Sequence, residues 1–275
     1  MQFVKPIPFR EALDKIGDRQ LVTSTFSSSQ WADVPAALRE RAFFSSRVES
    51  ARFLQRGRDS VTHFLAKNIE TLPNGLTALA TGSRAQFVDD MQRFAISEGL
   101  GDLVPEDKRG GLQDITSQKR LDLIFDVQTR QAQDYGNWVQ GQDPDALDAY
   151  PAQRFIRVQE VETARDWHQQ FEGEVRLKTD LEFWTLVNAD FGVPWGPWGL
   201  GDCGHDVEDV ERAAAEQLGL LEPGQPVLPA ATNFNDRLEA GTKDLDPDLE
   251  STLAAEFGPR LTRAAGALRW TPNDF

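Results

Sequence analysis

Apolar residues recur at helical spacing through the first half of the chain, and strand-like alternation replaces this pattern after Pro151. Spacings of three and four residues place side chains on one face of a helix, whereas alternation places them on one face of a strand. The longest stripe runs from Leu38 to Leu65 and predicts one helix from about Asp33 to Lys67. The order of the two patterns predicts an α+β fold: a long-helix N-terminal half, then a small mixed strand-and-loop module.

Turn-forming residues and changes of pattern divide the chain into four predicted parts. They are an N-terminal arm (1–32), a helical domain (33–150), an α+β module (151–221) and a C-terminal tail with a short helix (222–275). Within the helical domain, further helices are predicted from Ser83 to Gly99 and from about Ser117 to Gly141. The module is the part in which the chemically distinctive residues are concentrated.

The chain is acidic, with 44 Asp and Glu against 29 Lys and Arg, and its formal net charge is −15. A broad DNA-binding face needs clustered positive charge, so this balance disfavours one and favours a basic partner surface. Cys203 is the single cysteine, which excludes an intramolecular disulfide. With no apolar run near the ~18 residues of a membrane span and no apolar core at the N-terminus, we expect no membrane partner and folding in a reducing cytoplasm.

Three residues of the module are the candidates for a metal site. His168, Cys203 and His205 carry the ligand types that zinc prefers, but no fourth ligand is evident and the spacing matches no zinc signature. A Cys203–His205 nucleophilic pair is a second interpretation, although no third, orienting group is identified. The alternative is a small buried cysteine with two histidines that bond to the backbone. We therefore predict no catalytic residue, no cofactor and no bound metal.

A loop rich in Pro, Gly and Trp follows the predicted helix that contains Trp184. It includes Trp195 and Trp198. Exposed indole rings can stack on sugars or bases, and buried ones can form a small core where regular structure is scarce. We favour the core, because each indole brings a large apolar area.

The order of these elements resembles the minor head proteins of tailed phages, the Mu F-like or head morphogenesis family. The resemblance begins with Pro8–Leu13, Trp31 and Leu38–Phe43, and continues through the helix at Arg120–Arg130 with Ala132 and Gly136 after it. In the module it rests on a run of residues in a fixed order: Arg154, Arg157, Arg165–His168, Gly173, Asp180, Phe183–Trp184, the Pro/Gly/Trp loop, Cys203 and Gln217–Gly219. Many relatives have Cys-x-Cys where this chain has Cys203-Gly204-His205, which weighs against a shared metal site.

The resemblance implies a non-enzymatic virion protein of a phage or prophage that acts in head morphogenesis. It implies contacts with the portal protein or the major capsid protein, and with packaged DNA during its packaging or ejection. The protein would lie in the capsid interior or near the portal, after assembly in the host cytoplasm. The fold-defining residues are then Arg154, Trp167, His168, Trp184, Trp195, Trp198, Gly199 and Cys203. The alternatives are a metal-dependent hydrolase or nuclease, or an injected toxin-like effector, using the region of His168, Cys203 and His205.

Overall fold

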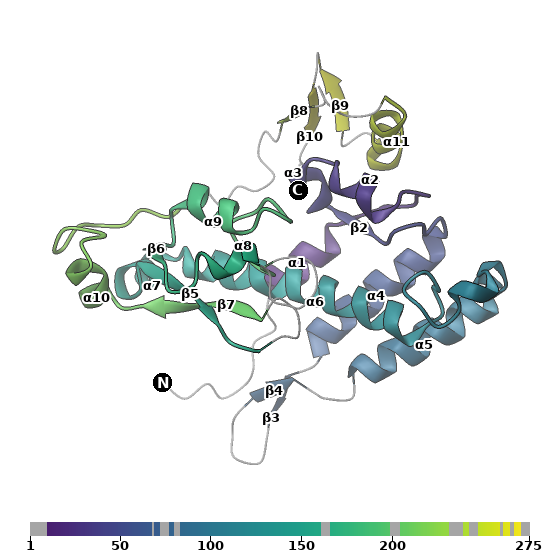
Figure 1. Ribbon diagram of the computed structural model, residues 1–275, viewed down its shortest axis with the longest axis horizontal. Coiled ribbons are helices and arrows are strands. Elements are labelled where there is room, and N and C mark those ends of the chain that lie inside the picture. Colours follow the sequence, from purple (N-terminus) through teal and green to yellow (C-terminus); the bar gives the residue numbers. More distant parts are fainter. Residues whose placement is uncertain are drawn as a thin grey trace. The chain divides into compact units, whose positions relative to one another are not determined.

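The computed structural model divides the chain into two compact units (Figure 1). Unit 1 comprises Met1–Gln133 and Glu239–Phe275, and unit 2 comprises Asp134–Leu238. Within them the structure describes residues 10–67, 69–71, 77–79, 83–160, 166–198, 204–230, 239–241, 247–258, 261–264 and 267–270. The division between the units at Gln133 and Asp134 falls inside the helix that runs from Gln118 to Gly141.

The fold is mixed α and β, with long helices mostly in the N-terminal half and small sheets later, as the periodicity predicts. The helices of unit 1 are α1 (Arg10–Gly17), α2 (Ser28–Ala32), α3 (Ala36–Arg39), α4 (Ala51–Lys67), α5 (Ser83–Ser97), η1 (Leu100–Leu103), η2 (Glu106–Lys108), α6 (Gln118–Gly141, whose end belongs to unit 2) and α11 (Pro247–Phe257). Its strands are β1 (Gln20–Val22), β2 (Ala42–Phe44), β3 (Ile69–Thr71), β4 (Thr77–Leu79), β8 (Glu239–Gly241), β9 (Leu261–Ala264) and β10 (Ala267–Trp270). Among the described helices, none is both long enough and apolar enough to cross a membrane.

The core of unit 1 is formed by apolar faces of α1, α4, α5 and α6. Phe53, Met91 and Phe125 are buried there, and the Phe64 ring meets Phe125 edge to face at 4.7 Å. Ala12 and Ile16 of α1 are completely buried in the same core. The N-terminal helix is therefore packed into unit 1.

The predicted helix from Asp33 to Lys67 is wrong in its first half. Residues 42–44 form β2, which pairs in parallel with β1 and places Phe43 opposite Leu21. Arg47 then takes a left-handed conformation with φ of 58°, which no helix interior accommodates. The helix restarts after Ser50, whose Oγ accepts a hydrogen bond from the Phe53 N–H at 3.2 Å. Pairing between distant strands thus overrides the local helical stripe.

Unit 2 is built on a three-stranded antiparallel sheet in the order β6-β5-β7. Its strands are β5 (Ala152–Arg157), β6 (Val175–Leu177) and β7 (His205–Val210), and its helices are α7 (Pro144–Ala149), α8 (Asp166–Gln169), α9 (Leu181–Val187) and α10 (Arg212–Gln217). The central strand pairs Phe155 with Val207 on β7 and Ala152 with Leu177 on β6. The strand-like alternation predicted after Pro151 corresponds to strands such as β5 and β6, and the predicted helix that contains Trp184 is α9.

Candidate functional site

The two predicted histidines of unit 2 meet at Phe155, a buried residue of the central strand β5. The His205 ring stacks on the Phe155 ring at 5.0 Å with an interplanar angle of 2°. The His168 ring lies 5.9 Å from Phe155 and 5.5 Å from His205, and Trp198 packs edge to face on Phe155 at 5.4 Å. Residues far apart in the sequence therefore converge on one aromatic side chain.

His205 is held by a carboxylate. Its side chain is fully buried, and its Nε2 lies 2.8 Å from Oε1 of Glu172. The same oxygen accepts a hydrogen bond from Nη2 of Arg157 at 2.5 Å. The hydrogen bond from His205, together with the hydrogen bond and charge of Arg157, holds the pKa of Glu172 below its ordinary value against the opposing effect of burial. Glu172 is therefore an anionic clamp that fixes two neighbouring side chains.

His168 is held by the backbone. It is buried, and its Nε2 lies 3.2 Å from the carbonyl oxygen of Val187 at the end of α9. Cys203, the third metal candidate, lies outside the described residues. Within the described parts of the chain, no three His, Cys, Asp or Glu side chains are grouped so that they could hold a metal ion. The two imidazoles thus lie in a core, packed against other rings.

The remaining residues predicted to define the fold occupy different environments. Trp184 is completely buried in the core with Phe155 and Trp198, and its Nε1 donates to the Leu177 carbonyl at 2.9 Å. The buried Trp195 packs with Tyr135 and Trp138 of α6. Three residues lie elsewhere: Trp167 is 45% exposed, Arg154 is a surface residue paired with Glu208, and Gly199 falls outside the described residues.

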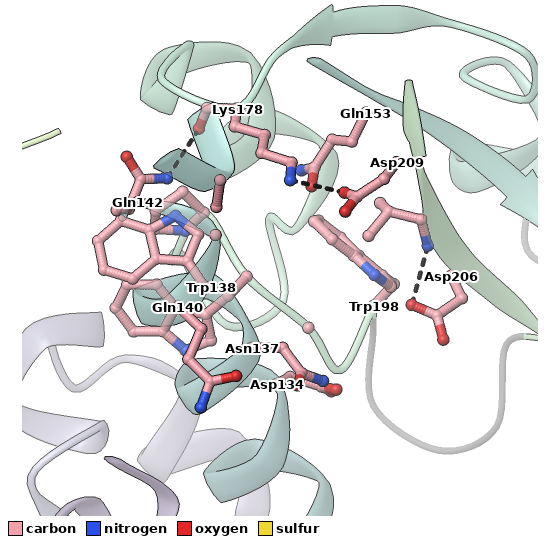
Figure 2. A pocket seen from close by; sticks show the side chains of 16 residues that line it. Asp134, Asn137, Trp138, Gln140, Gln142, Gln153, Lys178, Trp198, Asp206 and Asp209 are labelled. Carbon is pink, nitrogen blue, oxygen red and sulfur yellow. Dashed lines mark hydrogen bonds and ion pairs between the residues drawn. The ribbon is translucent and has the colours of Figure 1, made fainter. Parts of the chain in front are cut away.

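Unit 2 also contains a pocket that the sequence does not reveal. Its volume is about 460 Å³, within the usual range for small-molecule sites. Figure 2 shows Trp138 and Trp198 on opposite sides, with Lys178, Asp209 and Gln153 at one end and Asp134 and Asn137 at the other. Every lining residue that the structure describes belongs to unit 2.

An ion pair and a close backbone contact shape the two ends of this pocket. At one end, Nζ of Lys178 lies 2.7 Å from Oδ1 of Asp209; the lysine side chain is 6% exposed and the aspartate 54%. At the other end, the Asp134 carboxylate packs directly over Gly196, where an added Cβ would lie 2.6 Å from Oδ2. Glycine at position 196 is therefore required for this placement of Asp134.

Asp134, Lys178 and Asp209 were not among the residues predicted to form a site. Asp134 lies on a helix rich in polar residues, and the other two lie on short strands or their ends, so each matches an ordinary surface charge in the sequence. The one available signal was the glycine between Trp195 and Trp198, because a missing Cβ marks a close approach. A glycine alone does not indicate which side chain lies close to it.

The chain matches no protein-family model, no curated protein and no solved structure. The resemblance to phage minor head proteins therefore stays a prediction that rests on the order of residues in the sequence.

Proposed function

We propose that this chain is a minor head protein of a tailed phage or prophage, acting in head morphogenesis through contacts with the portal protein or the major capsid protein. The observation that carries the proposal is the packing of the unit 2 residues on which the resemblance rests. His168, Trp184 and Trp198 pack around Phe155. The Nε2 atom of His168 is within hydrogen-bond distance of the Val187 carbonyl, and that of His205 is within hydrogen-bond distance of Glu172. These side chains, which could otherwise suggest chemistry, are packed in a core, and this use supports a structural role.

A surface suited to a protein partner lies beside this core. Trp167 is 45% exposed, and Leu186 on α9 is 51% exposed. The Trp167 Nε1 donates to the Val187 carbonyl at 3.3 Å, which fixes the indole next to the end of α9. Exposed tryptophans held in one orientation are frequent hot spots of protein interfaces. We assign the portal or capsid contact to this surface, defined by Trp167 and Leu186.

The charge of the chain supports a protein as the primary partner. A formal net charge of −15 repels the phosphate backbone, so direct binding to duplex DNA has no broad electrostatic support. A contribution to DNA packaging or ejection would then come through the portal or capsid contact. The location that follows is the capsid interior or the vicinity of the portal.

The test is recovery of partners from cells that produce the phage. The tagged full chain is expected to recover portal or major capsid protein, and a Trp167→Ala/Leu186→Ala variant is expected to lose them. Leu218→Ala is the matched control, because Leu218 is also exposed in unit 2, at 55%, but lies at the end of α10. Recovery of no virion protein by the unaltered chain would overturn the proposal. Stoichiometric zinc that is lost in His205→Ala would favour a metal-dependent hydrolase or nuclease instead.

A further inference from the structure

One end of the unit 2 pocket holds a buried amide whose hydrogen-bonding atoms the fold does not use. Gln153 and Gln142 both line the pocket and are 8% and 3% exposed. The Gln142 amide is bonded at both atoms: its Nε2 donates to the Lys178 carbonyl at 3.5 Å, and its Oε1 accepts from the Ala230 N–H at 2.9 Å. In the part of the chain that the structure describes, the Gln153 amide has no such partner. Buried amides are normally hydrogen-bonded, so this one is available to a ligand.

The side chains beside Gln153 add further donors and acceptors. Gln153 on β5 lies opposite Asp209 on β7, so the two share one face of the sheet. Nζ of Lys178 lies 2.7 Å from Oδ1 of Asp209, whose side chain is 54% exposed. Figure 2 shows all three side chains at the same end of the pocket. An amide, an ammonium and a carboxylate suit hydroxyl groups, because a hydroxyl both donates and accepts.

The sides of the pocket are formed by indole rings. Trp138 and Trp198 lie on opposite sides of it (Figure 2). Trp138 is half-buried but its Nε1 is completely buried, so any part of the ring that reaches the pocket is carbon. The Trp195 ring packs against Trp138 at 4.8 Å, which restricts the movement of both rings. Indole faces are electron-rich and attract the weakly positive C–H groups of a ligand.

Polar groups at one end and indoles at the sides match the two surfaces of a pyranose ring. A pyranose presents C–H groups on its faces and hydroxyl groups around its edge. An anionic ligand gains less here, because the Lys178 ammonium is already opposed by Asp209. A purely apolar ligand would cover the Gln153 amide without bonding to it, which costs free energy. The ligand class therefore follows from the amide and the indoles together.

We propose that this pocket binds a neutral sugar, with a pyranose ring against Trp138 and hydroxyl groups at Gln153, Lys178 and Asp209. The sugar is either free or one unit of a glycan chain, since both present the same ring to the pocket. The inference goes beyond the proposed role in phage heads and does not depend on it, because these residues lie within unit 2 of one chain.

The first experiment titrates the full chain with neutral sugars, by calorimetry and saturation-transfer NMR. The probes are glucose, galactose, mannose and N-acetylglucosamine, together with a trisaccharide built from each. We expect at least one probe to bind with a Kd below about 1 mM. Tighter binding of a trisaccharide supports the proposal and identifies a glycan as the source, and equal binding of its monosaccharide identifies a free sugar. Binding of none of the probes overturns the proposal, as does tighter binding of adenosine or of the phosphate ester of the best sugar.

A matched pair of glutamine variants then places the binding in this pocket. Gln153→Met removes the amide at nearly constant shape and breaks no hydrogen bond to a described residue, so we expect about tenfold weaker sugar binding with no fall in Tm. Gln142→Met removes two hydrogen bonds to the backbone, so we expect a lower Tm. A purely structural role of Gln153 would instead lower Tm and leave binding unchanged. Unchanged binding by Gln153→Met overturns the proposal, whatever its Tm.

A third variant tests the aromatic wall. Trp138→Leu keeps an apolar side chain but removes the indole face, so we expect sugar binding at least about tenfold weaker in protein that circular dichroism shows to be folded. Tyr150→Leu is the control, because Tyr150 is a 41% exposed aromatic residue of unit 2 that is not among the described lining residues. Equal binding by the two variants would mean that no sugar ring lies against Trp138, and the proposal fails. If Trp138→Leu does not fold, Gln153→Met decides the question.

Discussion

The two units of this protein differ in how far their paired charged side chains are exposed. In unit 1, Lys15, Arg19 and Glu40 form a cluster whose side chains are at most 3% exposed. In unit 2, the Lys178–Asp209 pair keeps the lysine buried but leaves the aspartate half exposed at a pocket. A closed cluster can serve the fold, since no ligand reaches it, whereas a half-open pair can serve both the fold and a ligand.

The closed cluster shows strong mutual dependence of its charges. Burial lowers the pKa of Lys15 to about 8, against the attraction of Glu40. Burial alone would raise the pKa of Glu40, but the charges of Lys15 and Arg19 hold it below its ordinary value. Glu40 also lies 2.7 Å from Lys15 and 3.7 Å from Arg19. Glu40 is therefore a carboxylate that both buried cations contact.

The largest expected effect follows from removing that carboxylate. Glu40→Gln leaves Lys15 and Arg19 as buried cations with no compensating charge in this pair of contacts, and we expect a loss of about 3–5 kcal/mol in the free energy of unfolding. Urea unfolding measures the loss, and hydrogen exchange in α1 and β2 assigns it to unit 1. Asp89→Asn is the control, since its pair with Arg93 is exposed and is worth less than about 1 kcal/mol. A loss no larger than the control's would mean that the cluster does not stabilise unit 1.

The next effect concerns the aromatic core of unit 2. Trp184→Ala removes a completely buried indole and its hydrogen bond to Leu177, and we expect destabilisation of roughly 3–5 kcal/mol. Trp167→Ala makes the same chemical change at a position that is 45% exposed, where less than about 1 kcal/mol is expected. Thermal unfolding compares the two variants directly. Similar costs would show that the core around Phe155 is not what stabilises the unit.

A smaller effect is expected from alkaline pH. Between about pH 8 and 10.5, the unfolded chain binds the Lys15 proton and the folded chain does not. The unfolded state then holds more protons, so the free energy of unfolding rises with pH, by up to about 1.4 kcal/mol per pH unit. Lys15→Met removes this titration, so the difference between the pH profiles of the two proteins isolates it. Parallel profiles would mean that Lys15 keeps its ordinary pKa.

A local effect is expected at the end of the pocket. Gly196→Ala places a methyl group 2.6 Å from the Asp134 carboxylate, which must move, so we expect a cost of about 1–3 kcal/mol in the free energy of unfolding. Gly141→Ala adds a methyl group to the same lining at an ordinary distance of 3.7 Å from Lys178 Nζ. Thermal unfolding of both variants is the measurement. Equal stability of the two would show that the contact between Gly196 and Asp134 does not stabilise unit 2.

The smallest expected effect is at Arg154, which the sequence marks as fold-defining. Its ion pair with Glu208 spans β5 and β7 at 2.7 Å, but both side chains are more than 40% exposed. We expect Arg154→Ala to cost no more than about 1 kcal/mol in chemical denaturation. A much larger cost would restore the role that the resemblance assigns to this residue.

The sequence predicts the parts of this fold that local periodicity controls. The helices α5 and α6 and the strands β5 and β6 lie where the spacing of apolar residues places them. Strands β1 and β2 were not predicted. Their pairing joins Val22 to Phe44, which are distant in the sequence, and no local spacing of apolar residues indicates it.

The candidate site was predictable to a similar extent. The two histidines could be selected by residue type, and they do lie together at Phe155. The pocket could not, because it depends on which of many acids approaches Gly196 and which lysine is buried. Such contacts depend on tertiary packing, which composition and the spacing of residues do not predict.

The discontinuity of unit 1 has a consequence for synthesis of the chain. Thr23 donates a hydrogen bond at 2.9 Å to Glu256, 233 positions later in the chain. The ribosome therefore completes the whole of unit 2 before it produces the segment that α11 contributes to unit 1. Until α11 is synthesised, the part of unit 1 that it covers stays exposed. A chaperone can bind this exposed surface while translation continues.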